Sequence, residues 1–206
     1  MLARLKRATR DQDGAADHDR MSLLTAPVTR ASYVTFLEGI YGFEVPIESA
    51  FAMTSELGHV VDLRSRRHLR LLRADLAGLG VTDTSELDVC HSVVPFRTCG
   101  EALGWMYVID RNLLLNGVVQ RHLAQALPEQ LATAYLTGGG RAVGPRLEDL
   151  GAALDGTAQT GDIADQIIDA ARVAFGHQRS WFQQLARPHQ HAPASKHPRG
   201  APTFAA

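Results

Sequence analysis

Arginine and tyrosine side chains are the residues of this sequence best suited to hold an anionic ligand. Arg10, Arg111 and Arg121 carry guanidinium groups that can bind carboxylates, and Tyr107 can donate a hydrogen bond. The same side chains also suit solvated helix faces and an ordinary core tyrosine. Residue types alone therefore leave a carboxylate-bearing ligand and a purely structural role both open.

The sequence lacks the motifs of several common enzyme classes. It contains no G-x-G-x-x-G, P-loop, H-E-x-x-H or G-x-S-x-G pattern, and the glycine run at 138–140 lacks the Lys/Ser pattern of a phosphate loop. A di-iron oxidase would need Glu-x-x-His pairs that project into a helical bundle, and we expect no such pair here. These observations argue against nucleotide, zinc-protease, serine-hydrolase and di-iron chemistry.

Composition predicts one domain that binds neither nucleic acid nor membrane. The chain has 206 residues, 45% of them hydrophobic, and a formal net charge of -1, so it can bury one substantial core and has no global basic field. We find neither a signal-length apolar core at the N-terminus nor a run approaching the roughly 18 apolar residues of a membrane span. Cys90 and Cys99 have neither redox nor metal-site spacing. We therefore expect a cytoplasmic protein with free thiols.

Apolar residues recur with helical spacing along nearly the whole chain, whereas strict alternation is scarce, which predicts an all-α bundle. Beyond residue 186 the composition changes to Pro, His, Ala and Ser, so we expect a domain over 1–186 and a disordered tail over 187–206. Helices are expected over 2–23, from Thr29 onward with a kink or interruption at Pro46, and over 66–79, 99–127, 128–137, 144–154 and 161–185.

The segment at 102–123, ALGWMYVIDRNLLLNGVVQRHL, resembles the haem-covering helix of bacterial haem (heme) oxygenases of the phytochrome-linked, biliverdin-producing type. Family members read roughly A-L-G-x-L-Y-V-L-E-G-S-x-L-G-G-x-x-I-x-R-H-L at this place. Other similar segments follow in the family's order: LKRATR at 5–10, YVTFL and YGFEVPIE within 33–48, and LLRADLAGLG at 71–80. The resemblance spans residues 5–185 and implies a divergent member with the haem oxygenase-like helical bundle.

This resemblance implies a pocket between the first helix and the long helix, where family enzymes convert haem to biliverdin, ferrous iron and carbon monoxide. The pocket positions carried over are Arg10, Asp13, Asp17, Tyr107, Arg111, Asn112, Leu115 and Asn116. The family's axial histidine corresponds to Asp13, whose hard carboxylate suits ferrous haem poorly. His18 lies five residues further on, about 140° around a helix. Either residue is the metal ligand if haem is bound.

Glycines on the other face of the family's pocket let haem lie against the backbone. They correspond to Arg111, Leu115 and Asn116 here, and Asn112 stands where the family usually has serine. Side chains at these positions push the macrocycle away from the helix. Alternatively, the leucines at 113–115 fill the emptied space as core.

Three functions follow as hypotheses. The first is a haem oxygenase family protein whose ring-opening activity is impaired or absent, and which binds haem, another tetrapyrrole or a protein such as a sensor or regulator. The second is an active haem oxygenase with Asp13 or a repositioned His18 as an atypical axial ligand, supplying chromophore to a bacterial phytochrome. The third is a signalling module that docks on a partner through the leucine-rich face.

Overall fold

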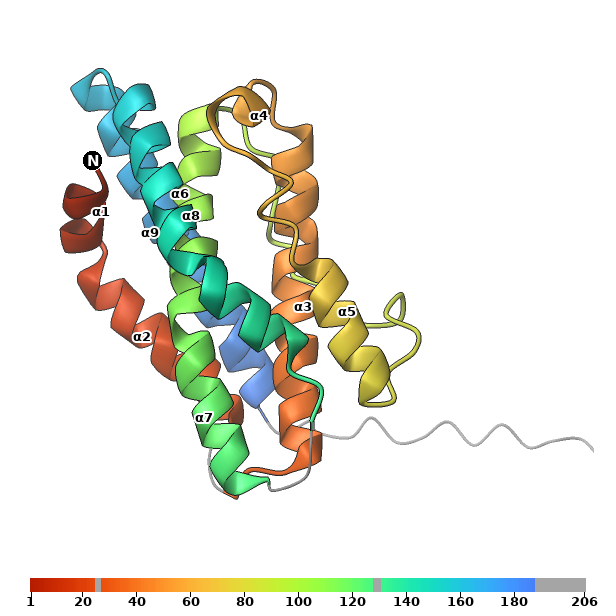
Figure 1. The fold of residues 1–206 in the computed structure, drawn as a ribbon. Helices are drawn as coiled ribbons and strands as arrows, with labels where there is room; N and C mark the ends of the chain where they lie inside the picture. The colour runs from red at the N-terminus through yellow and green to blue at the C-terminus, as the bar shows by residue number, and fades with distance from the viewer. Residues whose placement is uncertain (25–26, 128–130, 188–206) are drawn as a thin grey trace, which may run out of the picture.

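A computed structural model of the protein describes residues 1–24, 27–127 and 131–187, and every regular element in these ranges is a helix, which confirms the all-α class (Figure 1). No helix in the same ranges is both long enough and apolar enough to cross a membrane. The predicted tail lies outside them from residue 188 onward. The helices are α1 (Leu2–Ala8), α2 (Arg10–Met21), α3 (Arg30–Met53), α4 (Leu57–Val60), α5 (Leu69–Gly78), α6 (Cys99–Asn112), α7 (Asn116–Ala126), α8 (Ala134–Thr157) and α9 (Gly161–Ala186), with 3-10 turns at Ser22–Leu24 and Leu113–Leu115.

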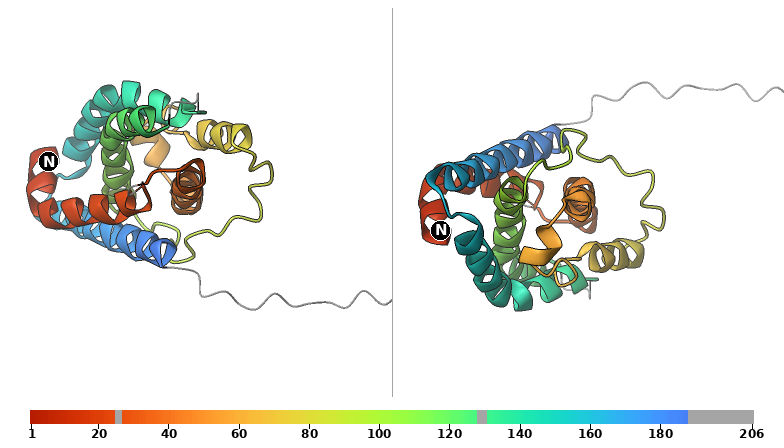
Figure 2. Two further views of the ribbon diagram at one scale, coloured as in Figure 1. Left: turned by 90° about the horizontal axis from the view of Figure 1, so that it is seen from below. Right: turned by 90° about the horizontal axis from the view of Figure 1, so that it is seen from above.

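Helix α6 forms the centre of the molecule. Its residues are buried on nearly every side, as expected for an apolar helix enclosed by other helices. It packs against α9, α8 and α3, and Figure 2 shows it between these helices when the molecule is viewed end-on. Gly104 permits the close approach of α9, because a Cβ at this position would lie 2.5 Å from the Ile167 carbonyl oxygen. Side chains of α6 therefore reach most of the interior.

The predicted first helix is divided at Thr9, so the expectation of one continuous helix over 2–23 was wrong. Thr9 has φ -117° and ψ 7°, and its hydroxyl donates to the Leu5 carbonyl oxygen at 3.0 Å. Gly14 lies inside α2 and does not interrupt it. Helix α1 packs on α8 and α9, whereas α2 packs mainly on α9. The division sets the direction of α2, which carries Asp13 and Asp17.

Helix α3 begins as predicted and continues further than predicted. Thr29 and Ser32 form a reciprocal capping box at its start. Pro46 does not end the helix, which runs to Met53. An interior proline costs about 3 kcal/mol. Burial of Ile47 and Phe51 in the core after Pro46 offsets this cost.

Helix α8 replaces the two separate helices predicted over 128–137 and 144–154. It runs from Ala134 through the glycine run to Thr157, and Pro145 lies inside it. Residues 128–130 lie outside the described residues. Tyr135 and Leu136 near one end and Leu150 and Leu154 near the other are buried. Tertiary burial at both ends thus overrides the poor helix propensity of glycine and proline.

A long connection joins α5 to α6, in agreement with the gap between the predicted helices 66–79 and 99–127. Gly80 has φ +103°, the left-handed conformation that favours glycine, and it ends α5. The loop passes along α3, where the Cys90 backbone N–H donates to the Gly42 carbonyl oxygen at 2.9 Å, and then reaches α6 (Figure 2). Cys90 and Cys99 are free thiols, as predicted.

Candidate functional site

Arg111, Asp13 and Asp17 meet between α6 and α2 and form a three-residue ion-pair cluster. Arg111 lies near the end of α6, and its guanidinium forms ion pairs with both carboxylates, which are one turn apart on α2. Its two Nη atoms donate to the two carboxylate oxygens of Asp17. A bidentate pair of this kind is the strong form of a guanidinium–carboxylate interaction. All three side chains are partly shielded from solvent. The guanidinium occupies the space between the two helices.

Tyr107 lies one turn before Arg111 on α6 and is buried beside the same cluster. Its hydroxyl lies near Thr9, and burial raises the pKa of this hydroxyl above its usual value. The ring packs edge-on against Phe175 of α9, with centroids 6.3 Å apart. Burial also raises the pKa of Asp13, although the charge of Arg111 opposes that shift. The structure thus brings together Asp13, Asp17, Tyr107 and Arg111 of the predicted pocket.

Other residues of the predicted pocket do not join this cluster. Arg10, His18 and Arg121 are exposed. Asn112 is buried and donates through Nδ2 to Gln178 Oε1 of α9 at 2.8 Å. Asn116 is buried and donates to the Tyr135 carbonyl oxygen at 3.4 Å. Asn112 therefore links α6 to α9, and Asn116 links α7 to α8.

The three leucines after Asn112 differ in their surroundings. Leu113 is fully buried, Leu115 is half-buried and Leu114 is 46% exposed. Leu113 is therefore part of the core, whereas Leu114 is not, so the expectation that the whole run 113–115 becomes core was wrong for Leu114. The 3-10 turn at Leu113–Leu115 rotates successive side chains to different sides of the chain.

The side chains of the predicted pocket do not fit haem. The carboxylate of Asp13 is held by Arg111 instead of being free to bind iron, and the alternative ligand His18 is exposed. The Arg111 side chain fills the gap that a glycine would leave open. An iron porphyrin placed here would have to separate this ion pair and leave its charges without partners.

A second group of polar side chains, which sequence reasoning missed, lies in the interior. We call it the polar interior cluster, and its members come from α3, from the segment before α5, from α6 and from α8: Glu44, Arg66, His68, Asp110, Tyr135 and Arg146. Buried charges are costly unless they are paired. Burial shifts the pKa of Glu44, His68 and Asp110 in this cluster.

Arg66 links three parts of the fold although its side chain is only 5% exposed. Its Nη2 atom donates to Asp149 Oδ2 at 2.9 Å and to the Arg146 carbonyl oxygen at 3.1 Å, both on α8. The same atom lies 3.4 Å from Asp110 Oδ2 on α6. Burial raises the pKa of Asp110 to about 6, although Arg66 and Arg146 oppose the shift. Asp110 therefore takes up a proton more readily than an exposed aspartate.

Glu44 is the most deeply buried carboxyl group of α3. Its Oε1 accepts a hydrogen bond of 2.8 Å from the Tyr135 hydroxyl, whereas Oε2 has no hydrogen-bond partner. Burial raises the pKa of Glu44 to about 7, against the lowering effects of Tyr135 and of Arg20 on α2. This carboxyl group therefore changes its charge close to neutral pH.

Arg146 of α8 reaches back to the segment from which Arg66 comes. Its Nη1 lies 2.8 Å from His68 Nδ1, and its Nη2 donates to the Ser65 carbonyl oxygen. Burial and the charges of Arg146 and Arg66 lower the pKa of His68 to about 3, so this imidazole is neutral at physiological pH. The Arg66 side chain thus reaches from the segment before α5 to α8, and the Arg146 side chain reaches from α8 to that segment.

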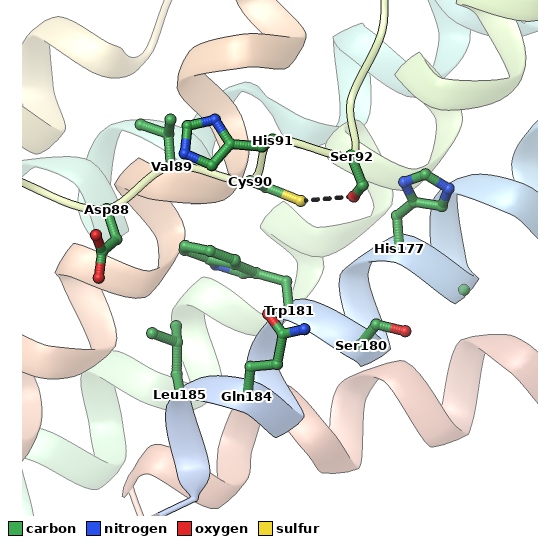
Figure 3. A pocket seen from close by; sticks show the side chains of 11 residues that line it. Asp88, Val89, Cys90, His91, Ser92, His177, Ser180, Trp181, Gln184 and Leu185 are labelled. Atoms are coloured by element: carbon green, nitrogen blue, oxygen red, sulfur yellow. Dashed lines mark hydrogen bonds between the residues drawn. The ribbon is translucent and has the colours of Figure 1, made fainter. Parts of the chain in front are cut away.

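An open groove of about 720 Å³ lies between the α5–α6 loop and the last turns of α9 (Figure 3). Cys90, His91 and Ser92 come from the loop, whereas His177 and Trp181 come from α9. The Cys90 thiol lies 3.2 Å from the Ser92 hydroxyl, and Figure 3 marks no bond to a histidine. These described residues thus lack the cysteine–histidine pair that activates a nucleophile.

Within the described residues, no group of three or more His, Cys, Asp or Glu side chains could hold a metal ion. Glu56 and His59 have the Glu-x-x-His spacing, but both are exposed and do not project into the bundle. The structure thus gives no support to a di-iron centre in this part of the chain.

Sequence reasoning could have found part of the polar interior cluster. Glu44 follows Ile40 by four residues and Asp110 follows Met106 by four, so each acidic residue continues an apolar helical stripe. A carboxyl group on such a stripe is a sign of a buried polar site. Arg66 and His68 precede α5 in an irregular segment and carry no comparable signal.

No protein-family model matches this sequence, and no curated protein is significantly similar to it. The family is therefore not established by comparison, and functional inference depends on the geometry described above.

Proposed function

We propose that this chain is a haem oxygenase-like protein that does not open the haem ring and acts instead as a ligand- or partner-binding module. The observation that carries the proposal is the ion pairing of Arg111 with Asp13 and Asp17 across the place where the resemblance puts haem. A carboxylate engaged in this way offers iron no nitrogen ligand, and the arginine side chain takes the room that a flat macrocycle needs.

Exposure of the alternative ligand also supports the proposal. His18 is exposed on α2, and the helix continues through Gly14 without a break that would turn His18 inward. An active enzyme with His18 or Asp13 as its axial ligand would need α2 to change its conformation or the ion pairs of Arg111 to separate. We therefore place the non-enzymatic function first.

Titration with hemin tests this proposal. The wild-type protein should give no sharp Soret band, because the site lacks an axial nitrogen ligand and lacks space for the porphyrin ring. The double variant Asp13→His with Arg111→Gly should bind hemin at least about tenfold more tightly, because it supplies both features. Absorbance spectra over a range of hemin concentrations measure the two affinities.

A matched control separates the designed site from nonspecific haem binding. The variant Asp11→His with Arg111→Gly has the same composition, but its histidine lies at an exposed position of α2. It should bind hemin no better than a variant with Arg111→Gly alone. A tight wild-type complex that yields biliverdin with reductant and oxygen would refute the proposal.

A second candidate function is protein docking, favoured by an exposed apolar pair at the junction of α6 and α7. Leu114 and Val118 are each 46% exposed and lie four residues apart. Leu114 also lines a groove between this junction and α8, together with Leu136 and Val143. Exposed apolar side chains placed together on one face are typical of interaction surfaces.

Substitution of Val118 tests the docking function. Val118→Glu should reduce recovery of a stoichiometric partner from the native cell at least about tenfold, because it puts a charge into the apolar contact. Val173→Glu is the matched control, since Val173 is 50% exposed on α9, away from this face. Equal recovery with both variants would contradict docking through Leu114 and Val118. Quantitative mass spectrometry of affinity-purified samples provides the measurement.

A further inference from the structure

Two hollows beside the last turns of α9 form one continuous groove. The first, of about 720 Å³, lies between α9 and the α5–α6 loop, and the second, of about 610 Å³, lies between α9, α3 and an adjacent stretch of that loop. Both are lined by Asp88, Trp181 and Leu185, so we treat them as one surface and call it the α9 groove (Figure 3). It follows α9 from Gly176 to Arg187, about 17 Å at the rise of a helix.

The floor of the α9 groove is apolar and held in place by contacts with α3. Trp181 Nε1 donates to the Gly39 carbonyl oxygen at 2.8 Å. Leu185 also packs on Gly39, where a Cβ would lie 2.9 Å from Leu185 Cδ1. Leu23 and Leu87 line the same floor and, like Leu185, are half-buried. The groove therefore offers a ready-made aromatic and aliphatic surface to an occupant.

The rim of the α9 groove is acidic. Glu38, Glu86 and Asp88 line it, and Glu86 and Asp88 are exposed. None of the three carboxylates forms an ion pair within the described part of the chain. Arg187 is the one arginine or lysine among the described lining residues. Three carboxylates against one guanidinium make the groove complementary to a cationic segment.

A cationic segment of this chain begins where the groove ends. Residues 188–206, which lie outside the described residues, include Lys196 and Arg199 and contain neither Asp nor Glu. Prolines stand at positions 188, 193, 198 and 202. Proline-rich segments favour an extended conformation and bind aromatic-lined grooves at a small cost in conformational entropy. Such a segment cannot form a core of its own, but a groove that is already formed requires none.

We propose that residues 188–206 bind in the α9 groove of the same molecule, with Lys196 and Arg199 beside its acidic rim and Phe204 on its apolar floor. Arg187 has φ -68° and ψ 130°, so the chain leaves the helix there in an extended conformation. At about 3.1 Å per residue, roughly six extended residues cover the length of the groove, and the segment is longer than that. The bound segment keeps other cationic peptides out of the groove.

Attachment to the end of α9 favours binding within one molecule over binding to a second copy. A short covalent connection gives a segment an effective concentration in the millimolar range, which a separate molecule does not reach in dilute solution. The α9 groove is separate from the ion-pair cluster of Arg111 and from the exposed pair Leu114 and Val118. The inference therefore does not depend on the proposed function.

Competition with a labelled synthetic peptide of residues 188–206 tests the inference. Full-length protein with Lys196→Glu and Arg199→Glu should bind this peptide at least about tenfold more tightly than the wild-type protein does. The reason is that the wild-type segment occupies the groove at high effective concentration, whereas the reversed segment is repelled by the rim. Fluorescence anisotropy at low salt measures both affinities. Equal affinity for the two proteins, or binding to neither, would overturn the inference.

Further charge reversals locate the peptide. Adding Glu86→Lys and Asp88→Lys to the tail-reversed protein should weaken peptide binding at least about tenfold, because the rim becomes cationic. The matched control adds Asp11→Lys and Glu148→Lys instead, two exposed carboxylates that do not line the groove, and should leave the affinity unchanged. Equal weakening by both pairs would show a general charge effect and contradict binding in the groove.

Nuclear magnetic resonance gives a direct measurement of position in the wild-type protein. Ring protons of Phe204 should show nuclear Overhauser effects to methyl groups of Leu87 or Leu185, and the tail-reversed protein should lose them. A mixture of labelled and unlabelled protein separates contacts within one molecule from contacts between two. Effects that arise only between molecules would place the segment in the groove of a second copy and overturn the intramolecular assignment, as would their absence in the wild type.

Discussion

Replacement of Arg66 by Met should lower the free energy of unfolding by about 4 kcal/mol, because it leaves the buried Asp110 without its nearest positive charge. The change also removes the hydrogen bonds of Arg66 to Asp149 and to the Arg146 carbonyl oxygen. Methionine keeps most of the volume, so the loss reports electrostatics rather than packing. Urea denaturation followed by circular dichroism measures the change.

A second substitution should reverse much of this loss. When Asp110→Asn is added to Arg66→Met, no uncompensated charge remains at this point of the core, and we expect at least half of the stability to return. Arg64→Met is the matched control, because Arg64 is exposed in the same segment, and its effect should stay within about 0.5 kcal/mol. An Arg66→Met protein as stable as the Arg64→Met protein would show that the buried ion pair contributes little.

Substitution of Gly104 by Val should lower the free energy of unfolding by more than about 3 kcal/mol, because it forces apart α6 and α9, which pack against each other along the core. A Cβ at Gly104 would lie 2.5 Å from the Ile167 carbonyl oxygen and 2.7 Å from Ala170 Cβ. Backbone atoms on the α9 side cannot move without shifting the helix. Thermal unfolding measured by calorimetry gives the size of the effect.

Gly14→Val provides the control for helix propensity. Gly14 also lies inside a helix, but no atom is within 4 Å of a Cβ built there. Valine is a better helix former than glycine, so this variant should be as stable as the wild type or slightly more stable. Similar losses in both variants would mean that the close approach of α6 and α9 does not depend on Gly104.

The sequence predicted four members of the Arg111 cluster but not how they pair, and four other predicted pocket positions lie outside it. Asp13, Asp17, Tyr107 and Arg111 are named from the sequence through a family resemblance, and the structure brings these four together. That Arg111 binds both carboxylates depends on the direction of α2 relative to α6. The break at Thr9 contributes to this direction, and no glycine or proline marks it in the sequence.

Local pattern alone determined the all-α class, the start of α3 after Thr29 and the end of α5 near residue 79, because spacing and capping act within a few residues. Tertiary structure decided how far helices continue and which buried charges pair, because both depend on contacts between distant parts of the chain. Helices α3 and α8 continue through Pro46 and Pro145, since burial offsets the lost backbone hydrogen bonds. Arg66 and Asp110 are partners only because the chain brings positions far apart in sequence into one core, where a charge must be paired.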